Sequence, residues 1–248
     1  MSDKRVLIIL SSASSIPVQK SDGSTAHPET GFFLKELAQP LMRLLDAGYT
    51  PIFASPNGVK PNMDPMSDNA LWFLSFAEKE REKALIEKMK VEHNFSFPVD
   101  FQSLTEPELR KFSGVFIPGG HAPMTDLGND SELGRVLRFF HNEKKPTAAI
   151  CHGPIALLST HVQGEVFCYN GYKVTCYANK EELANELMWG GKIRKCEDAL
   201  KECGCNVETA LIPLMPNVIV DRELVTGQNP ASADQLGQKF VQMLEGAA

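Results

Sequence analysis

The amino-acid sequence predicts an α/β fold in which a parallel β-sheet is covered by helices on both faces. The first observation is that short apolar, β-branched runs alternate with longer amphipathic stretches, as in repeated β-α-β units. The second is the run RVLIIL at residues 5–10, whose unbroken apolar character is typical of a strand buried on both sides. The chain has 248 residues, 43% of them hydrophobic, which is enough for one large core. We therefore expect a single domain over residues 1–248.

The remaining elements are predicted from the same two patterns. A polar loop follows the first strand, and the apolar stripe that starts at Thr30 predicts a helix that ends at Gly48. The run TPIFAS then predicts a second strand at residues 50–55. Further along, the alternation predicts a strand at 114–120, a helix at 131–143, a strand at 146–151, a helix at 152–160, and a closing strand, loop and helix over 224–244.

Two segments depart from this alternation. Residues 68–93 have a helical period and one strongly charged face, which predicts a peripheral helical insertion at about 60–100 rather than a sheet crossover. Such a helix is also suited to cover a pocket as a lid. In VFCYNGYKVTCYA, two strand-like runs flank Asn170-Gly171, a pair that favours the positive φ angles of a tight turn, so we expect a small hairpin there.

Composition excludes several classes of function. The formal net charge is -6 and no basic block is present, so we expect no nucleic-acid partner. The first apolar run is too short for a signal peptide, and no stretch is long enough to span a membrane. The 6 cysteines therefore read as reduced thiols of a cytoplasmic protein. Cys203-Gly204-Cys205 lacks a companion histidine or second cysteine pair, so it does not predict a zinc site.

Cys151 is the first candidate for chemistry. It lies where a predicted parallel strand ends and a helix begins at once, and such turns project into the ligand clefts of α/β proteins. Amide groups at the helix start would favour a thiolate and a developing oxyanion. The sequence AICHG is a loose relative of the nucleophile elbow G-x-S-x-G. The alternative is that Cys151 is a buried small apolar residue, as free cysteines often are.

Two further groups are expected near the same sheet edge. Gly119 and Gly120 follow another apolar strand, so the amides of Gly120 and His152 could form an oxyanion hole, although paired glycines are also common in ordinary turns. His121 could be a capping or packing residue. Glu36 falls on the apolar side of the first helix, where a carboxyl group must be protonated or paired. It could donate to the thiolate, or simply lie at the edge of an amphipathic helix.

These pieces together resemble the ThiJ/PfpI superfamily of flavodoxin-like proteins. The resemblance covers nearly the whole chain, through KRVLIIL, Glu36, FIPGGHAPMTDL, AAICHGPIALL and RELVTGQNPASADQLG. The early loop SDGSTAHPETGFF and the insertion at 68–93 are similar to the heat-shock-protein-31-like subgroup, which includes glutathione-independent glyoxalase III. Members of this subgroup are also described as stress chaperones and protein deglycases.

The resemblance implies a role for each candidate. Cys151 matches the nucleophile, His152 its adjacent histidine, Glu36 the acid beside the thiol, and Gly120 the oxyanion loop. For the third acid, relatives differ, and we favour Glu182 as the partner of the histidine. Glu181 is the fallback, and an asparagine such as Asn179 could orient an imidazole but not stabilise its charge. One bacterial branch has a His/Glu/His metal site, but LMRLLDAGYT lacks its helix histidine, so we expect no metal.

The implied function is that of a glyoxalase III, a cofactor-independent lyase. Cys151 would attack methylglyoxal or another small 2-oxoaldehyde, and Glu36 or His152 would move a proton from C1 to C2, so that lactate is released. The resemblance also implies a homodimer. Alternatives are a PfpI-type cysteine protease, a deglycase, a stress chaperone, or a redox sensor in which Cys151 is oxidised. A glutamine amidotransferase is excluded, because it needs a later histidine and none follows His161.

Overall fold

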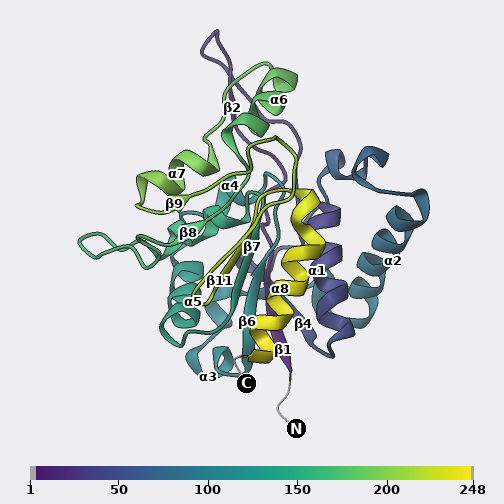
Figure 1. Cartoon of the computed structure of the whole chain (residues 1–248), viewed down its shortest axis with the longest axis vertical. Helices are drawn as coiled ribbons and strands as arrows, with labels where there is room; N and C mark the ends of the chain where they lie inside the picture. Colours follow the sequence, from purple (N-terminus) through teal and green to yellow (C-terminus); the bar gives the residue numbers. More distant parts are fainter. Residues whose placement is uncertain (1–3, 247–248) are drawn as a thin grey trace.

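The fold is described from a computed structural model, in which residues 4–246 are described (Figure 1). Its centre is a seven-stranded sheet in the order β10-β11-β7-β6-β1-β4-β5. All neighbouring strands are parallel except the antiparallel pair β10–β11. The strands are β1 (Arg5–Ile9), β4 (Thr50–Ser55), β5 (Val99–Asp100), β6 (Phe112–Ile117), β7 (Thr147–Ile150), β10 (Val218–Asp221) and β11 (Leu224–Gly227).

Helices cover both faces of this sheet, which confirms the predicted α/β fold. The side chains of β1 alternate between two cores, so that Val6 and Ile8 join the core under α1 and α8, whereas Leu7 and Ile9 join the core under α5. The helices are α1 (Leu34–Asp46), α2 (Phe76–Glu92), α3 (Glu106–Leu109), α4 (Pro123–Asp126), α5 (Ser131–Asn142), α6 (Asn179–Trp189), α7 (Cys196–Glu202) and α8 (Ala233–Gly246).

The strand order places a ligand crevice next to β1. The chain adds β4 and β5 on one side of β1, and β6 and β7 on the other side, so the direction of winding reverses between β1 and β6. The loops that follow β1 and β6 therefore diverge at the carboxyl edge of the sheet, which is where α/β proteins bind ligands. Cys151 follows β7 directly, at this same edge.

The predicted insertion contains α2, but its place in the topology differs from the expected one. It links β4 to β5, and these strands pair in parallel, with Ala54 opposite Val99. The segment is thus a sheet crossover whose helix packs on α1. The sequence concealed this because β5 has only two residues. Ser75 caps the helix by accepting a hydrogen bond from the Glu78 amide at 3.1 Å.

Glu82, on the buried side of α2, makes the stability of this layer dependent on pH. The side chain is fully buried, accepts a hydrogen bond from Gln39, and has one oxygen without a partner among residues 4–246. Burial raises the pKa of Glu82 from 4.5 to about 7. A raised carboxyl pKa contributes stability that is complete below pH 4.5 and lost as the pH rises through about 7.

We therefore expect Glu82→Gln to raise the melting temperature above pH 7 and to change it little near pH 4.5, where the native side chain is already neutral. Thermal unfolding followed by circular dichroism at both pH values measures this difference. Glu87→Gln, on the exposed side of the same helix, is the matched control and should have little effect at either pH. An equal change of the melting temperature in Glu82→Gln at both pH values would contradict the expectation.

The hairpin expected around Asn170-Gly171 does not form. Gly171 has a positive φ of 74°, as a tight turn requires, but the flanking runs do not pair with each other. Phe167 and Tyr169 instead pack into a core with α7, and β8 (Lys173–Val174) pairs in parallel with β9 (Asn206–Val207). Besides β10–β11, an antiparallel pair is formed by β2 (Val18–Gln19) and β3 (Thr25–Ala26).

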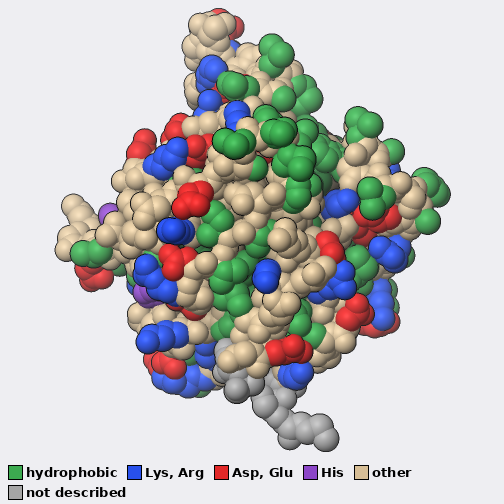
Figure 2. All heavy atoms as spheres, in the orientation of Figure 1, with side chains coloured by type: hydrophobic (Ala, Val, Ile, Leu, Met, Phe, Trp, Pro, Cys, Tyr) green, Lys and Arg blue, Asp and Glu red, His purple; other side chains and the backbone are tan. Residues whose placement is uncertain are grey.

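Large apolar side chains are exposed on the part of the surface around α6 and the start of α2, where Figure 2 shows hydrophobic atoms gathered in the upper half of the molecule. We call the set on α6 and on the segment before β10 the α6 apolar surface; it consists of Leu183, Leu187, Met188, Leu211, Ile212, Leu214 and Met215. Within residues 4–246, no helix has both the length and the apolar character required to cross a membrane.

Candidate active site

Cys151 lies on a strained turn at the end of β7. Its φ is +61°, a left-handed value that is unfavourable for a residue with a side chain. The turn is fixed on both sides, because the Cys151 amide donates to Gly227 and its carbonyl accepts from the Tyr177 amide, at 2.9 and 2.8 Å. A Cβ at Gly153 would lie 2.5 Å from the Ile117 carbonyl oxygen, so only glycine lets the chain turn this close to β6. The turn therefore has the geometry of a nucleophile elbow.

The segment after Cys151 is a 3₁₀ helix, Gly153–Thr160, where the sequence predicted a helix at 152–160. All eight of its residues are buried, and it packs against α5 and α7. Packing against several neighbouring elements therefore determines the conformation of this segment. A single apolar face with helical periodicity does not. The first turn closes with a hydrogen bond from the Ile155 amide to the His152 carbonyl at 3.1 Å.

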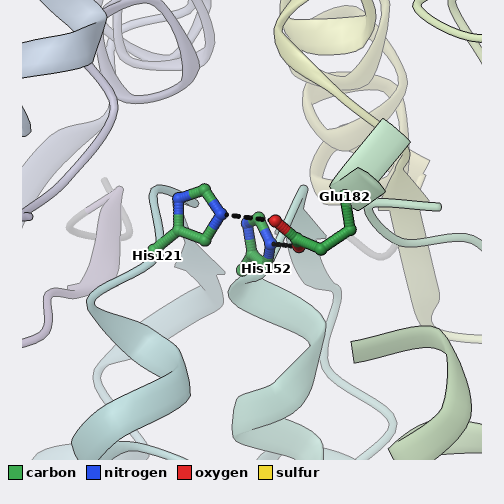
Figure 3. A group of neighbouring side chains, drawn as sticks. All are labelled: His121, His152 and Glu182. Atoms are coloured by element: carbon green, nitrogen blue, oxygen red, sulfur yellow. Dashed lines mark hydrogen bonds and ion pairs between the residues drawn. The ribbon is translucent and has the colours of Figure 1, made fainter. Parts of the chain in front are cut away.

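A chain of hydrogen-bonding groups runs from the thiol to α6. The Cys151 Sγ lies 3.3 Å from His152 Nδ1, and His152 Nε2 lies 2.6 Å from Glu182 Oε2 (Figure 3). The two alternatives for the third acid lie elsewhere: Glu181 accepts from the Ala178 amide, and the Asn179 side chain donates to Asp198. The structure thus brings Glu182, the favoured residue, to His152.

His121 is a member of this cluster that the sequence reasoning did not single out. Its Nε2 lies 2.9 Å from Glu182 Oε1, and its ring centroid is 4.0 Å from that of His152 (Figure 3). Asn185 donates to the same Oε1 at 2.9 Å. One carboxylate therefore accepts hydrogen bonds from two imidazoles and an amide. One feature of the sequence could have identified His121: it directly follows Gly119-Gly120, just after the carboxyl end of β6.

Charge in the cluster is concentrated on Glu182. Burial opposes its ionisation, but the two imidazoles hold the pKa of Glu182 well below its usual range. Burial, with the neighbouring His121, lowers the pKa of His152 from 6.5 to about 4. At neutral pH, His152 is therefore a neutral imidazole. Its Nε2 donates to Glu182, which leaves Nδ1 free to accept the proton of the Cys151 thiol.

The resting sulfur differs from the ionised one expected from the sequence. Burial, with the nearby Glu36 carboxyl, raises the pKa of the Cys151 thiol well above its usual range, although the Gly120 amide lowers it. Glu36, in the first turn of α1, is also fully buried, and burial raises its pKa to about 8 despite its contact with the thiol. Neither of its oxygens makes a hydrogen bond of good geometry among residues 4–246. At neutral pH this carboxyl is an acid that can donate to a thiolate once one forms.

The loop Gly119-Gly120 brings backbone amides to the sulfur. Gly120 has a φ of +93°, and a Cβ there would lie 2.1 Å from the Gly31 carbonyl oxygen. Its amide lowers the pKa of the Cys151 thiol, because it favours negative charge on the sulfur. This is the position expected for one donor of an oxyanion hole.

The cavity beside the thiol is small. Its volume is about 20 Å³, the space of about one water molecule. Trp72 forms part of its roof and is held by a hydrogen bond from its Nε1 to the Met66 carbonyl at 3.0 Å and by an edge-to-face contact with Phe33. A substrate larger than a water molecule therefore requires some of the lining residues to move. The lining residues are Phe33, Asp64, Met66, Trp72, Gly120, His121, Cys151, His152, Tyr177, Asn185 and Pro230.

His121, His152 and Glu182 are also the residues here that could hold a metal ion. Their donor atoms lie within 4.8 Å of one another, and two imidazoles with one carboxylate form a set that zinc accepts. A metal would have to replace the hydrogen bonds of 2.9 and 2.6 Å that already join these groups. The arrangement as it stands is that of a proton relay.

The fold and the site define an α/β protein with a cysteine on a nucleophile elbow and a histidine–glutamate pair beside it. The chain belongs to the DJ-1/PfpI family, whose model matches residues 31–243. The expected ThiJ/PfpI membership and the flavodoxin-like fold are thereby confirmed.

The relatives are distant in sequence but similar in fold. The protein/nucleic acid deglycase HchA of Staphylococcus aureus is 25% identical over 219 residues, which cover 86% of this chain and 71% of the relative. The crystal structure of glyoxalase III from Candida albicans superposes with a TM-score of 0.77 at 19% identity, over 98% of both chains. The Rapid Encystment Protein 24 KDa of Francisella tularensis gives 0.78 at 22% identity, over 97% of this chain and 99% of that one. These two structural likenesses show the shared fold.

Proposed function

We propose that the chain is a glutathione-independent glyoxalase III, which converts methylglyoxal or related 2-oxoaldehydes to 2-hydroxy acids. The observation that carries the proposal is the relay Cys151–His152–Glu182 beside the buried acid Glu36. The small volume of the cavity favours a small substrate over a peptide and therefore a glyoxalase over a PfpI-type protease. A family in which one relative is named a deglycase and another a glyoxalase III supports carbonyl chemistry.

The first step would be attack of the sulfur on the aldehyde carbon, C1. The thiol proton passes to His152 Nδ1, 3.3 Å away, as the S–C1 bond forms, and Glu182 stabilises the resulting imidazolium. The C1 oxygen takes negative charge near the Gly120 amide and is then protonated, which gives a hemithioacetal. Glu36, neutral at pH 7, is one donor for this proton.

The second stage would turn the hemithioacetal into a thioester. A base removes the hydrogen of C1 and returns it to C2, so that C1 is oxidised and C2 reduced within the same molecule. Water then attacks the thioester, releases lactate and restores the Cys151 thiol. Methylglyoxal and water are the only reactants consumed, so the reaction balances without glutathione or an external oxidant.

The test is turnover by the purified chain. We expect lactate to form from methylglyoxal in the absence of glutathione and in the presence of a metal chelator, as measured by proton NMR. The same preparation with its thiols alkylated is the control and should form none, because the nucleophile is blocked. A native chain that leaves methylglyoxal unconverted would rule out the proposed function.

A second candidate function is that of a stress chaperone. It is favoured by the α6 apolar surface, on which Leu187 is 84% and Leu211 95% exposed. Suppression of the aggregation of an unfolded client, equal in the native chain and in Cys151→Ala and without lactate formation, would favour this function. The homodimer expected from the resemblance is a separate prediction, and a second copy could cover this surface; size-exclusion chromatography with light scattering tests it.

Two expectations about partners also stay predictions. The name of the Staphylococcus aureus relative includes nucleic acids, whereas the net charge of -6 in this chain favours a small-molecule substrate alone. A cytoplasmic location agrees with the expected reduced state of the nucleophile.

A further inference from the structure

We propose that His121 is a second catalytic base, which carries the proton between C1 and C2 of the substrate bound to Cys151. The inference rests on the proposed glyoxalase function and assigns its second stage to a residue outside the Cys151–His152–Glu182 relay. Glu182 would then serve two imidazoles, one directed at the sulfur and the other at the substrate.

The two groups first considered for this step are already engaged. His152 presents Nδ1 to the thiol and Nε2 to Glu182, so both of its nitrogens carry protons once it has accepted the proton of Cys151. Glu36 lies fully buried beside the thiol and is not among the residues that line the cavity; it becomes a carboxylate only after it has given its proton to the C1 oxygen. The group assigned here to accept the hydrogen of C1 is instead His121, which lines the cavity.

His121 has a lone pair available to accept a proton. The ionised Glu182 can only accept, so the hydrogen bond of 2.9 Å places a proton on His121 Nε2 and leaves the lone pair on Nδ1. Among residues 4–246, no hydrogen-bond partner of this Nδ1 is found, and Figure 3 shows it on the side of the ring away from Glu182. His121 also lines the cavity that contains the thiol.

The backbone holds this imidazole beside the cavity that contains the thiol. His121 follows Gly120, whose amide lowers the pKa of the Cys151 thiol, and both residues line the cavity. The ring is fixed from the other side by its contacts with His152 and with Trp189, at centroid distances of 4.0 and 4.8 Å. An imidazole oriented by a carboxylate in this way is a competent general base.

The proposed step balances as follows. His121 Nδ1 takes the proton of C1, and the electrons of the C1–H bond form a C1=C2 double bond while the C2 carbonyl oxygen becomes negative. The hydroxyl proton moves from the C1 oxygen to the C2 oxygen. His121 then returns its proton to C2, and the C1 oxygen forms the carbonyl of the thioester. No atom or electron is gained or lost by the bound substrate.

The test is His121→Gln, whose amide can still donate to Glu182 but cannot act as a base. We expect lactate formation to fall about 10²- to 10⁴-fold, the usual contribution of a general base. The rate of Cys151 alkylation by iodoacetamide should stay close to that of the native chain, because the relay to the sulfur is intact. Methylglyoxal deuterated at C1 should give a larger isotope effect in the variant, since proton transfer becomes rate-limiting.

Asn185→Leu is the matched control, because it removes the other donor to Glu182 Oε1 without removing a base. Asn185→Leu should lower the rate of Cys151 alkylation and the rate of lactate formation by a similar factor, because it disturbs Glu182 and, through it, His152. Unchanged lactate formation in His121→Gln would overturn the role of His121, and so would a parallel loss of alkylation, which would make it a positioning residue for Glu182. Absence of turnover in the native chain would instead overturn the glyoxalase function itself, and this inference with it.

Discussion

Replacement of Cys151 by alanine is expected to lower lactate formation from methylglyoxal about 10⁴-fold or more, to the rate of the uncatalysed reaction. The sulfur is the proposed attacking atom, and neither His152 nor Glu36 can form the thioester in its place. The fold should be retained, because the change removes one buried sulfur from a turn held by hydrogen bonds to Gly227 and Tyr177. Lactate formation and the melting temperature, measured on the same preparation, check both parts.

Cys176→Ala is the matched control for this variant. Cys176 is buried like Cys151, but its thiol donates to the Tyr177 carbonyl at 3.6 Å and does not line the cavity. Turnover should stay near that of the native chain. If Cys151→Ala formed lactate at the native rate, the proposed nucleophile would be wrong, and Cys151 would fit a redox-sensing role better.

Gly119→Ala is expected to abolish turnover and to lower the free energy of unfolding by about 3 kcal/mol. A Cβ at this position would lie 2.3 Å from Glu36 Oε2, 2.5 Å from the Cys151 Cβ and 2.7 Å from the Ile150 carbonyl oxygen. The last two atoms belong to the strained turn and to β7, so they cannot move aside as the end of a flexible side chain would. The methyl group must therefore displace Glu36 or Cys151.

Urea denaturation followed by fluorescence, together with the lactate assay, measures both effects of Gly119→Ala. Gly246→Ala is the control, since a Cβ there meets no atom within 4 Å and alanine favours the end of α8. It should leave stability and turnover nearly unchanged. A native-like unfolding midpoint for Gly119→Ala would show that the sheet edge adapts to a methyl group, contrary to this expectation.

The order of strands and helices was predictable because burial on both faces leaves a direct trace in the sequence. In β1 every residue from Val6 to Ile9 is buried, and RVLIIL contains no polar break. The elbow at Cys151 was predictable for a related reason, since small residues must flank a turn that joins a buried strand to a buried helix. The fold class and the position of Cys151 follow from such local constraints.

Features that depend on how distant segments meet could not be predicted in this way. The sequence left Glu182, Glu181 and Asn179 as alternatives, because all three start α6 and only the packing of this helix in the fold decides which one reaches His152. The raised pKa of the Cys151 thiol likewise arises from burial among residues of distant segments, such as Phe33, Trp72 and Tyr177 around the cavity, which a local pattern does not contain. The importance of His121 depends on sharing a carboxylate with His152, 31 residues away along the chain.

The left-handed backbone at Cys151 also limits which amino acids this scaffold could ever use for covalent chemistry. At a φ of +61° an unbranched Cβ is tolerated with strain, whereas a second heavy atom on Cβ collides with the main chain. Serine could therefore replace the thiol during evolution, but threonine could not, and hydrolases that arise on this turn should be cysteine or serine enzymes.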